Sequence, residues 1–288
     1  MVTVRLMGGL GNQMFQYAIG RSMAHDLHEK LILDTTFYDV KHSKTTNWNY
    51  ELYHLNIKCE ILKNTVARRL KNLLTRKISS VIPQLCPRYI HEKTMQYDSA
   101  IFNKEHNIYL DGYWQCEKYF YHNADIIRND LQVITSSDER NQYWFNLIND
   151  TTNSVCLHVR RGDYVTNLEA NRTHGTCSLD YYHAAIKYFS DYFENPVFFV
   201  FSDDIEWAKE YIITEHQTYF MTQNGADKGY EDLRLMMQCK HFIIANSSFS
   251  WWGAWLGKYQ DKVVVCPKRW FNDPEMKTDI ICDSWVSM

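Results

Sequence analysis

An imidazole and a guanidinium lie two residues apart where a predicted strand ends. In residues 155–160, apolar and other side chains alternate with the period of a β-strand, which places His158 and Arg160 on one face. The strand runs out into Gly162, and the planar fork of arginine suits a bidentate contact with a phosphate. These residues fit an anion-binding strand end and, equally, a salt-bridged structural one.

Polar side chains also follow two later apolar runs. Residues 197–201 lead into Asp203 and Asp204, and a third run covers residues 241–245. Ligands of an open α/β sheet bind at the carboxyl ends of its strands, and the start of a helix favours anions. Simple N-capping is the competing interpretation for the serines of the third segment. The polar residues after that run are Asn246, Ser247, Ser248, Phe249 and Ser250.

The predicted elements around these residues alternate between strand and helix. Residues 3–7, 12–27 and 31–33 predict a strand, a helix and a second strand. The second half predicts a right-handed, mostly parallel sheet. Its predicted strands are 155–160, 197–201, 241–245 and 263–266, and its predicted helices are 179–193, 205–213, 230–239 and 251–256. A short polar stretch at 151–154 suggests a boundary between domains 1–152 and 153–288.

Five segments, in order, resemble the motifs of the α-1,2-fucosyltransferases, glycosyltransferase family 11. They are GGLGNQMFQYA (8–18), GYWQCEKYF (112–120), HVRRGDY (158–164), FSDD (201–204) and NSSFSWW (246–252). The resemblance runs from residue 8 to about residue 256. It implies a GT-B-type α/β fold, in which two Rossmann-like domains face each other across a cleft. Domain 1–152 is then the acceptor side, and domain 153–288 binds the nucleotide of GDP-fucose.

The reaction that this resemblance implies is transfer of L-fucose from GDP-fucose to O2 of a terminal galactose, with inversion and without a metal. It assigns His158 and one of Asp203 and Asp204 to guanosine, because a carboxylate accepts from guanine N1–H and N2–H together. Negative charge grows on the β-phosphate, and Arg160 with the N–H groups of residues 247–249 is expected to stabilise it. The predicted donor-binding residues are His158, Arg160, Asp203, Asp204, Asn246, Ser247, Ser248 and Phe249.

Inversion requires the acceptor hydroxyl to lose a proton. Asp163 is the first candidate base, and a structural carboxylate held by an arginine is the competing interpretation. Glu169 and His174, in the segment after strand 155–160 that is expected to be a loop, are reserve candidates, and Asn12 orients the hydroxyl if the reaction uses no base. Gln13, Tyr113, Trp114 and Gln115 are the predicted acceptor-binding residues, although most aromatic side chains of the first half are expected to form core.

Neither a cofactor nor a metal is expected. The chain contains no Asp-x-Asp, and an adjacent pair such as Asp203 and Asp204 is more often a helix cap or a base reader than a metal site. Its eight cysteines are scattered without a Cys-x-x-Cys, which excludes a zinc ribbon and a dithiol redox motif. Free thiols are typical of a cytoplasmic protein.

Composition limits the partners. The net charge of −3 argues against a general nucleic-acid surface. There is no signal-peptide core and no apolar run of membrane-spanning length, and the first motif begins at Gly8, as in a soluble bacterial type that serves O-antigen or capsule biosynthesis. Residues 63–82 predict a basic amphipathic helix, either a solvated face or a peripheral contact with anionic lipid. The acceptor is then a galactose-terminated oligosaccharide or a lipid-linked glycan.

Two other functions are compatible with parts of the pattern. Gly9 and Gly11 open a helix after a strand, and Asp34 ends the next strand, as in an NAD-binding fingerprint. Met14 stands where that fingerprint needs its third glycine, so the match is incomplete. A non-catalytic protein that binds a GDP-sugar would keep Arg160 and the serine loop but lack a base and an acceptor site.

Overall fold

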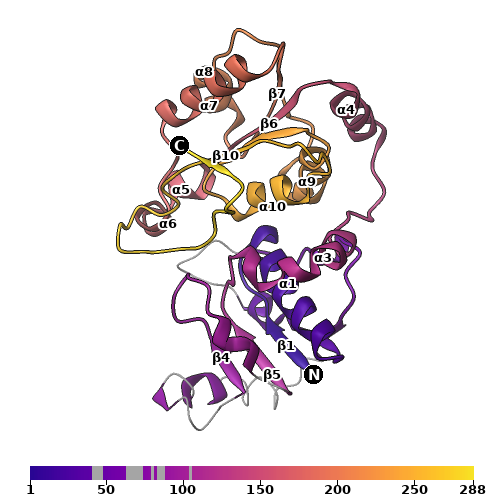
Figure 1. Cartoon of the computed structure of the whole chain (residues 1–288), viewed down its shortest axis with the longest axis vertical. Helices are drawn as coiled ribbons and strands as arrows, with labels where there is room; N and C mark the ends of the chain where they lie inside the picture. The colour runs from indigo at the N-terminus through magenta and orange to yellow at the C-terminus, as the bar shows by residue number, and fades with distance from the viewer. Residues whose placement is uncertain (41–47, 63–73, 79–80, 83–87, 104–105) are drawn as a thin grey trace. The chain divides into compact units, whose positions relative to one another are not determined.

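The computed structural model describes residues 1–40, 48–62, 74–78, 81–82, 88–103 and 106–288, and these form two compact units (Figure 1). Unit 1 contains Met1–Gln132 and Lys277–Ile280, and unit 2 contains Val133–Met276 and Ile281–Met288. Each unit is a parallel sheet with helices, so the expected α/β class is confirmed. The roles of 1–152 as acceptor side and of 153–288 as donor side remain predictions.

The sheet of unit 1 has the strand order β3-β2-β1-β5-β4, and its strands are parallel. From β1 the chain moves outward through β2 and β3 on one side, and it then crosses to the opposite edge, where it forms β4 and afterwards β5 beside β1. Strands β1 and β5 are therefore neighbours in the sheet although they lie far apart in the chain. The strands are β1 (Val2–Arg5), β2 (Leu31–Asp34), β3 (Glu60–Ile61), β4 (Tyr89–His91) and β5 (Ile108–Asp111).

Helix α1 (Leu10–Asp26) follows β1 directly and is buried along most of its length. Gly20 makes this packing close, because a Cβ there would lie 2.3 Å from Val4 Cγ2. The dinucleotide fingerprint would have placed its glycine at Met14, whereas close helix–strand contact is supplied here by Gly20, in a later turn of the helix. The other helical elements are η1 (Thr36–Asp39), η2 (Leu52–His54), η4 (Ser99–Asn103), η5 (Glu117–Tyr119), η6 (Tyr121–Asn123) and α3 (Ala124–Asp130).

The basic helix expected over 63–82 lies mostly outside the described residues. Its described part, 74–78 and 81, is helical. In the described part of the chain, no helix is both long enough and apolar enough to cross a membrane.

The sheet of unit 2 has the order β11-β10-β9-β6-β7-β8 and is parallel throughout, as predicted. Strand β6 leads to β7 and β8 on one side and to β9 and β10 on the other, so the order reverses between β6 and β9. The strands are β6 (Ser154–Val159), β7 (Val197–Ser202), β8 (Thr218–Phe220), β9 (His241–Ile243), β10 (Val264–Cys266) and β11 (Val286–Ser287).

The helices of unit 2 cover this sheet and include two that the sequence pattern did not predict. The core packs Val155, Leu157 and Val159 of β6 against Tyr182 and Phe189 of α7. The unpredicted helices, α5 and α6, occupy the segment expected as a loop after β6. The helices are α4 (Glu139–Asp150), α5 (Gly162–Thr166), α6 (Leu168–Thr173), α7 (Leu179–Tyr192), α8 (Ile205–Tyr211), η7 (Ala226–Lys228), α9 (Gly229–Met236) and α10 (Ser248–Leu256).

Candidate functional site

The polar residues predicted after three strands lie at one edge of the unit 2 sheet. Strand β6 pairs with β7 on one side and with β9 on the other, so the loops that follow these strands are neighbours. The strand order reverses between β6 and β9, and the carboxyl edge at such a reversal is the usual ligand-binding place of an open α/β sheet. The sequence therefore brings Arg160, Asp203 and the 246–249 loop to a plausible binding edge.

The guanidinium of Arg160 lies between two carboxylates. Its Nη2 is 2.5 Å from Asp163 Oδ1, and its Nη1 is 2.8 Å from Asp203 Oδ2. Although burial opposes the charge, Asp203 and Asp163 raise the pKa of Arg160 above its ordinary value. The guanidinium also lies over the Tyr164 ring, 5.2 Å from its centroid. Arg160 is thus a fixed cation, and part of its fork already binds the protein's own carboxylates.

Asp203 and Asp204 connect the end of β7 to the end of β6. Asp203 Oδ1 accepts a hydrogen bond from Arg161 N at 2.8 Å, and a Cβ on Gly162 would lie only 2.4 Å from Asp203 Oδ2. Glycine at 162 therefore permits this close approach. Asp204 caps α8 through Trp207 N at 3.3 Å and pairs with Arg161 Nε at 3.1 Å. The prediction that one of the two reads guanine remains open.

His158 is a neutral buried ring at this edge. Burial, with a smaller contribution from the charge of Arg160, lowers the pKa of His158 to about 3. Among the described residues its Nδ1 has no hydrogen-bond partner, and its ring centroid is 5.9 Å from that of Phe249. His158 can therefore offer a ligand a hydrogen bond but no charge.

The 246–250 loop is held tightly by its own side chains. Asn246 donates from Nδ2 to the carbonyl oxygens of His174 at 2.9 Å, Gly175 at 3.2 Å and Trp270 at 3.1 Å. Ser247 caps α10 by accepting from Phe249 N at 3.3 Å, so the capping interpretation describes a real contact. The N–H groups in the first turn of α10 are the feature of this loop that favours an anion.

The candidate bases differ in their surroundings. Asp163 is engaged by Arg160, as the structural interpretation requires. Glu169 lies in the first turn of α6 rather than in a loop, and Asn167 caps that helix by accepting from Glu169 N and Ala170 N. His174 stacks on Tyr164 at 4.8 Å, and burial lowers its pKa. The identity of the base stays a prediction.

In unit 1, Asn12 and Gln115 meet beyond the carboxyl ends of the neighbouring strands β1 and β5. Gln115 Nε2 donates to Asn12 Oδ1 at 2.7 Å and so joins the start of α1 to the segment after β5. Gln13 has a different environment, because its amide donates to Gly8 O at 3.0 Å and Asn49 O at 2.7 Å and accepts from Glu51 N at 2.9 Å. Gln13 is fully buried and ties backbone segments together.

Tyr113 and Trp114 face different surroundings, and a residue that sequence reasoning missed holds both. Tyr113 is 37% exposed, whereas Trp114 is buried against Tyr119 in a T-shaped contact at 5.6 Å. Glu92 accepts from Tyr113 N at 2.6 Å and from Trp114 N at 3.0 Å. Burial raises the pKa of Glu92 to about 7. The one signal in the sequence was an acidic residue directly after the short strand β4.

Asp34, the acidic residue of the dinucleotide alternative, has a structural role in unit 1. It is fully buried, accepts from Tyr109 OH at 2.5 Å and from Thr36 N at 3.0 Å, and is therefore not presented to a ribose.

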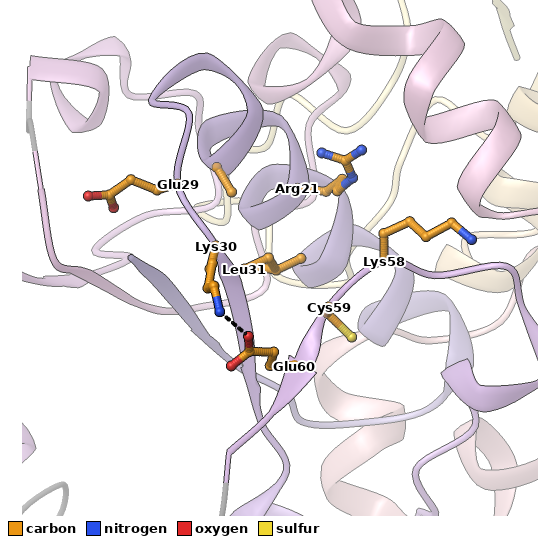
Figure 2. Close-up of a pocket in the computed structure, with 8 residues that line it drawn as sticks. Arg21, Glu29, Lys30, Leu31, Lys58, Cys59 and Glu60 are labelled. Carbon is orange, nitrogen blue, oxygen red and sulfur yellow. Dashed lines mark hydrogen bonds and ion pairs between the residues drawn. The ribbon is translucent and has the colours of Figure 1, made fainter.

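Two cavities are lined by residues other than those described at these two edges. Figure 2 shows one of about 220 Å³ in unit 1, beside the amino ends of β2 and β3, where Lys30 and Glu60 pair at 2.7 Å. Arg21 lines this cavity but pairs with Asp130 at 2.8 Å. A cavity of about 390 Å³ in unit 2 is lined by Arg172, Thr173 and residues 272–276. In the described part of the chain, no group of three His, Cys, Asp or Glu residues could hold a metal ion, and metal independence itself remains a prediction.

Known sequences match the whole chain. The model of Glycosyl transferase family 11 matches residues 1–288. An alpha-1,2-colitosyltransferase of Escherichia coli is 35% identical over 302 residues, which cover 99% of this chain and 98% of that protein. The O-antigen biosynthesis glycosyltransferase WbnK of Escherichia coli is 32% identical over 306 residues, which cover 98% and 99%. A human galactoside alpha-(1,2)-fucosyltransferase 1 is 33% identical over 103 residues, 35% of this chain and 28% of that protein.

Solved fucosyltransferases share the fold. NodZ from Bradyrhizobium superposes with a TM-score of 0.52 at 12% identity, over 88% of this chain and 91% of that one. An Arabidopsis thaliana FUT1 mutant in complex with GDP superposes with a TM-score of 0.52 at 11% identity, over 91% of this chain and 69% of that one. This likeness confirms the expected GT-B-type fold.

Proposed function

This chain belongs to glycosyl transferase family 11, and from that premise we propose that it transfers L-fucose from GDP-fucose to O2 of a terminal galactose, inverting the anomeric centre without a metal. The observation that carries the proposal is the position of Arg160, a fixed cation at the strand reversal of unit 2. A breaking sugar–diphosphate bond leaves negative charge on the β-phosphate, and a preorganised cation stabilises that charge as it forms.

The carboxylates on Arg160 have a part in this step. Asp203 and Asp163 orient the guanidinium before the donor binds. We propose that the diphosphate replaces Asp163 on Nη2, because a phosphate oxygen accepts the same charge-assisted hydrogen bond. Hydrogen bonds to charged groups contribute about 1.5–3 kcal/mol each, and about 1.4 kcal/mol changes a rate tenfold. The exchange removes the Arg160 contact from Asp163 Oδ1, and the Asp163 carboxylate is our candidate for the base that takes the acceptor proton.

The other donor contacts follow from the same edge. The neutral ring of His158 and one of Asp203 and Asp204 are proposed to bind guanosine. The first turn of α10, from Ser248, supplies N–H groups toward the phosphates. The capped and buried parts of that loop, Asn246 and Ser247, support the site by fixing the backbone rather than by direct contact.

The acceptor is proposed to be a galactose-terminated oligosaccharide or a lipid-linked glycan. Asn12 and Gln115 offer it neutral amide groups, and Tyr113 offers an exposed ring. A cytoplasmic location, with peripheral contact of residues 63–82 at anionic lipid, would suit a lipid-linked acceptor. These statements are proposals that rest on the family and on the positions of the residues in unit 1.

A second donor is favoured by one observation. The Escherichia coli relative with 35% identity is named an alpha-1,2-colitosyltransferase. We therefore propose GDP-colitose as a second donor, which would differ from GDP-fucose in the sugar alone. The edge built around Arg160 suits either of them, and the sugar-binding surface decides between them.

A transfer assay tests the proposal. GDP-fucose, GDP-colitose and a UDP-sugar are offered with a panel of β-galactosides, with and without EDTA, and the product linkage and anomeric configuration are read by NMR. We expect an α-1,2-linked product from a GDP-sugar, formed equally well in chelator. Loss of activity in EDTA that Mg²⁺ or Mn²⁺ restores would contradict metal independence. Binding of GDP-sugars without transfer to any acceptor would favour the non-catalytic alternative.

A further inference from the structure

The contact between Asn12 and Gln115 occupies a special place in unit 1. Strands β1 and β5 are neighbours in the sheet, Asn12 lies in the first turn of the helix after β1, and Gln115 follows β5. Their hydrogen bond of 2.7 Å therefore lies beyond the carboxyl ends of these strands, the edge at which open α/β folds bind ligands.

This contact determines which end of the Asn12 amide is presented. Asn12 Oδ1 accepts from Gln115 Nε2, which fixes the orientation of the amide. The group left to act on a ligand is Nδ2, which donates and cannot accept. Asn12 is half-buried, so the donor remains within reach of solvent. Asn12 can therefore donate a hydrogen bond to the oxygen of a sugar hydroxyl, but it cannot accept the proton that this hydroxyl must lose.

Gln115 is placed by the two residues before it. Trp114 has a φ of +58°, in the left-handed region that a bulky side chain rarely adopts. Its indole is buried, and its carbonyl accepts from Cys116 N at 2.8 Å. The chain leaves this turn at Gln115, so the direction of Gln115 depends on how Trp114 is held.

Glu92 holds Trp114 in this conformation. Its carboxylate reaches from the end of β4 and accepts from two successive N–H groups, at 2.6 Å from Tyr113 N and 3.0 Å from Trp114 N. A Cβ on Gly112 would lie 2.4 Å from Glu92 Cβ, so a glycine is needed for the carboxylate stem to pack against the turn. Both carboxylate oxygens are thereby committed to the backbone.

We propose that Glu92 is a positioning residue, which through Trp114 and Gln115 sets Asn12 as a hydrogen-bond donor to the acceptor sugar. The inference rests on the proposed function, and it names the part of unit 1 that recognises the acceptor. Glu92 acts on the sugar indirectly, because its oxygens face the Tyr113 and Trp114 amides.

The test uses Glu92→Gln, which keeps the shape but replaces one acceptor oxygen with a donor that opposes a backbone N–H. Glu60→Gln is the matched control, since Glu60 is an exposed carboxylate of the same sheet. We expect Glu92→Gln to lower kcat/KM for the acceptor by about 10- to 100-fold while GDP affinity stays the same, since misplacing a positioned group has effects of this order. Hydrogen exchange at the Tyr113 and Trp114 amides should become faster in this variant alone.

A double-mutant cycle separates positioning from mere folding. The losses of kcat/KM caused by Asn12→Ala and by Glu92→Gln should not be additive, because both variants remove the same hydrogen bond from Asn12 to the acceptor sugar. Gln115→Ala, which leaves the Glu92 contacts in place, should reproduce the loss and should also be non-additive with Asn12→Ala. This second variant keeps the test decisive if Glu92→Gln folds poorly.

Three outcomes would overturn the inference: activity of Glu92→Gln equal to that of Glu60→Gln, additive losses in the cycle, or full activity in Gln115→Ala. Failure of the proposed function looks different, because the unmodified protein would then transfer no sugar. In that case hydrogen exchange still tests whether Glu92 holds the backbone of Tyr113 and Trp114. Unchanged exchange in Glu92→Gln would overturn this part of the inference.

Discussion

The carboxyl edges of the two sheets are built from different chemistry. At β6 and β9 in unit 2, Arg160 is paired with Asp163 and Asp203, and Arg161 is paired with Asp204. At β1 and β5 in unit 1, the side chains that meet are the amides of Asn12 and Gln115. One edge therefore offers fixed charge, and the other offers directed neutral hydrogen bonds.

This difference teaches how one fold can divide a transfer reaction. A diphosphate needs charge that is held in place before it arrives, and ion pairs with carboxylates hold Arg160 in this way. A sugar hydroxyl is neutral, so charge would add little selectivity, whereas a donor of known orientation discriminates between hydroxyl positions. On the proposed function, the carboxyl edge of the sheet suits the leaving group in unit 2 and the acceptor in unit 1.

The largest expected effect is on Arg160. Arg160→Lys should lower kcat/KM by about 10²- to 10³-fold, because a single ammonium cannot replace a planar fork that stabilises developing charge. Steady-state kinetics with the donor varied measure the loss, and Arg172→Lys, an exposed arginine of α6, is the control. Near-normal kinetics in Arg160→Lys at an unchanged melting temperature would remove the charged edge from the mechanism.

A smaller effect is expected from Asp163→Asn. If the donor frees Asp163 to act as the base, kcat should fall by about 10²-fold or more, because the amide cannot take a proton. GDP affinity should not weaken, because the variant removes a carboxylate that competes for Arg160. A combined loss of GDP affinity and melting temperature would instead show that Asp163 is a structural partner of the arginine.

The smallest effect concerns the pH dependence of unit 1. Burial raises the pKa of Glu92 to about 7, and a protonated Glu92 can no longer accept from both backbone N–H groups. Acceptor kcat/KM should therefore fall as the pH drops through 7, and this limb should be absent in Glu92→Gln. Other ionisable groups near this turn include Arg5, Asp98, Asp111, Tyr113, Cys116 and Tyr119.

Stability should respond to Glu92 in the opposite direction. Its folded pKa lies above the unfolded value near 4.5, so its contribution is fully present below that value and is lost as the pH rises through about 7. Melting temperatures of the unmodified protein and of Glu92→Gln across pH 5–8 measure this contribution. The role assigned to Glu92 would be contradicted if activity and stability both rose with pH, and did so equally in the unmodified protein and in Glu92→Gln.

Much of unit 2 could be predicted because its signals are local. The apolar runs that form β6, β7 and β9 fix a parallel order, and the residues after them must then share one edge. The short helices α5 and α6 could not be predicted from periodicity, because six residues cover less than two turns. The cap at Asn167 was their one local signal.

The contacts that side chains make across the sheet could not be predicted from the sequence. Asn246 was expected at the donor, but its amide bonds three carbonyls that lie 24, 71 and 72 residues away along the chain. Glu92 was missed because its partners, Tyr113 and Trp114, follow a different strand. Such pairings depend on the register of β4 and β5, which no local pattern encodes.

The central claim is that the charged edge of unit 2 holds a guanosine diphosphate, and binding of GDP tests it most directly. Thermal unfolding is measured with GDP, UDP and NAD⁺ on the unmodified protein and on Arg160→Lys. A ligand that binds only the folded state adds about 2.7 kcal/mol of stability at a hundredfold excess over its Kd. The account predicts stabilisation by GDP alone, and loss of most of it in Arg160→Lys. Equal stabilisation by UDP or NAD⁺, or a GDP effect that survives intact in Arg160→Lys, would contradict it.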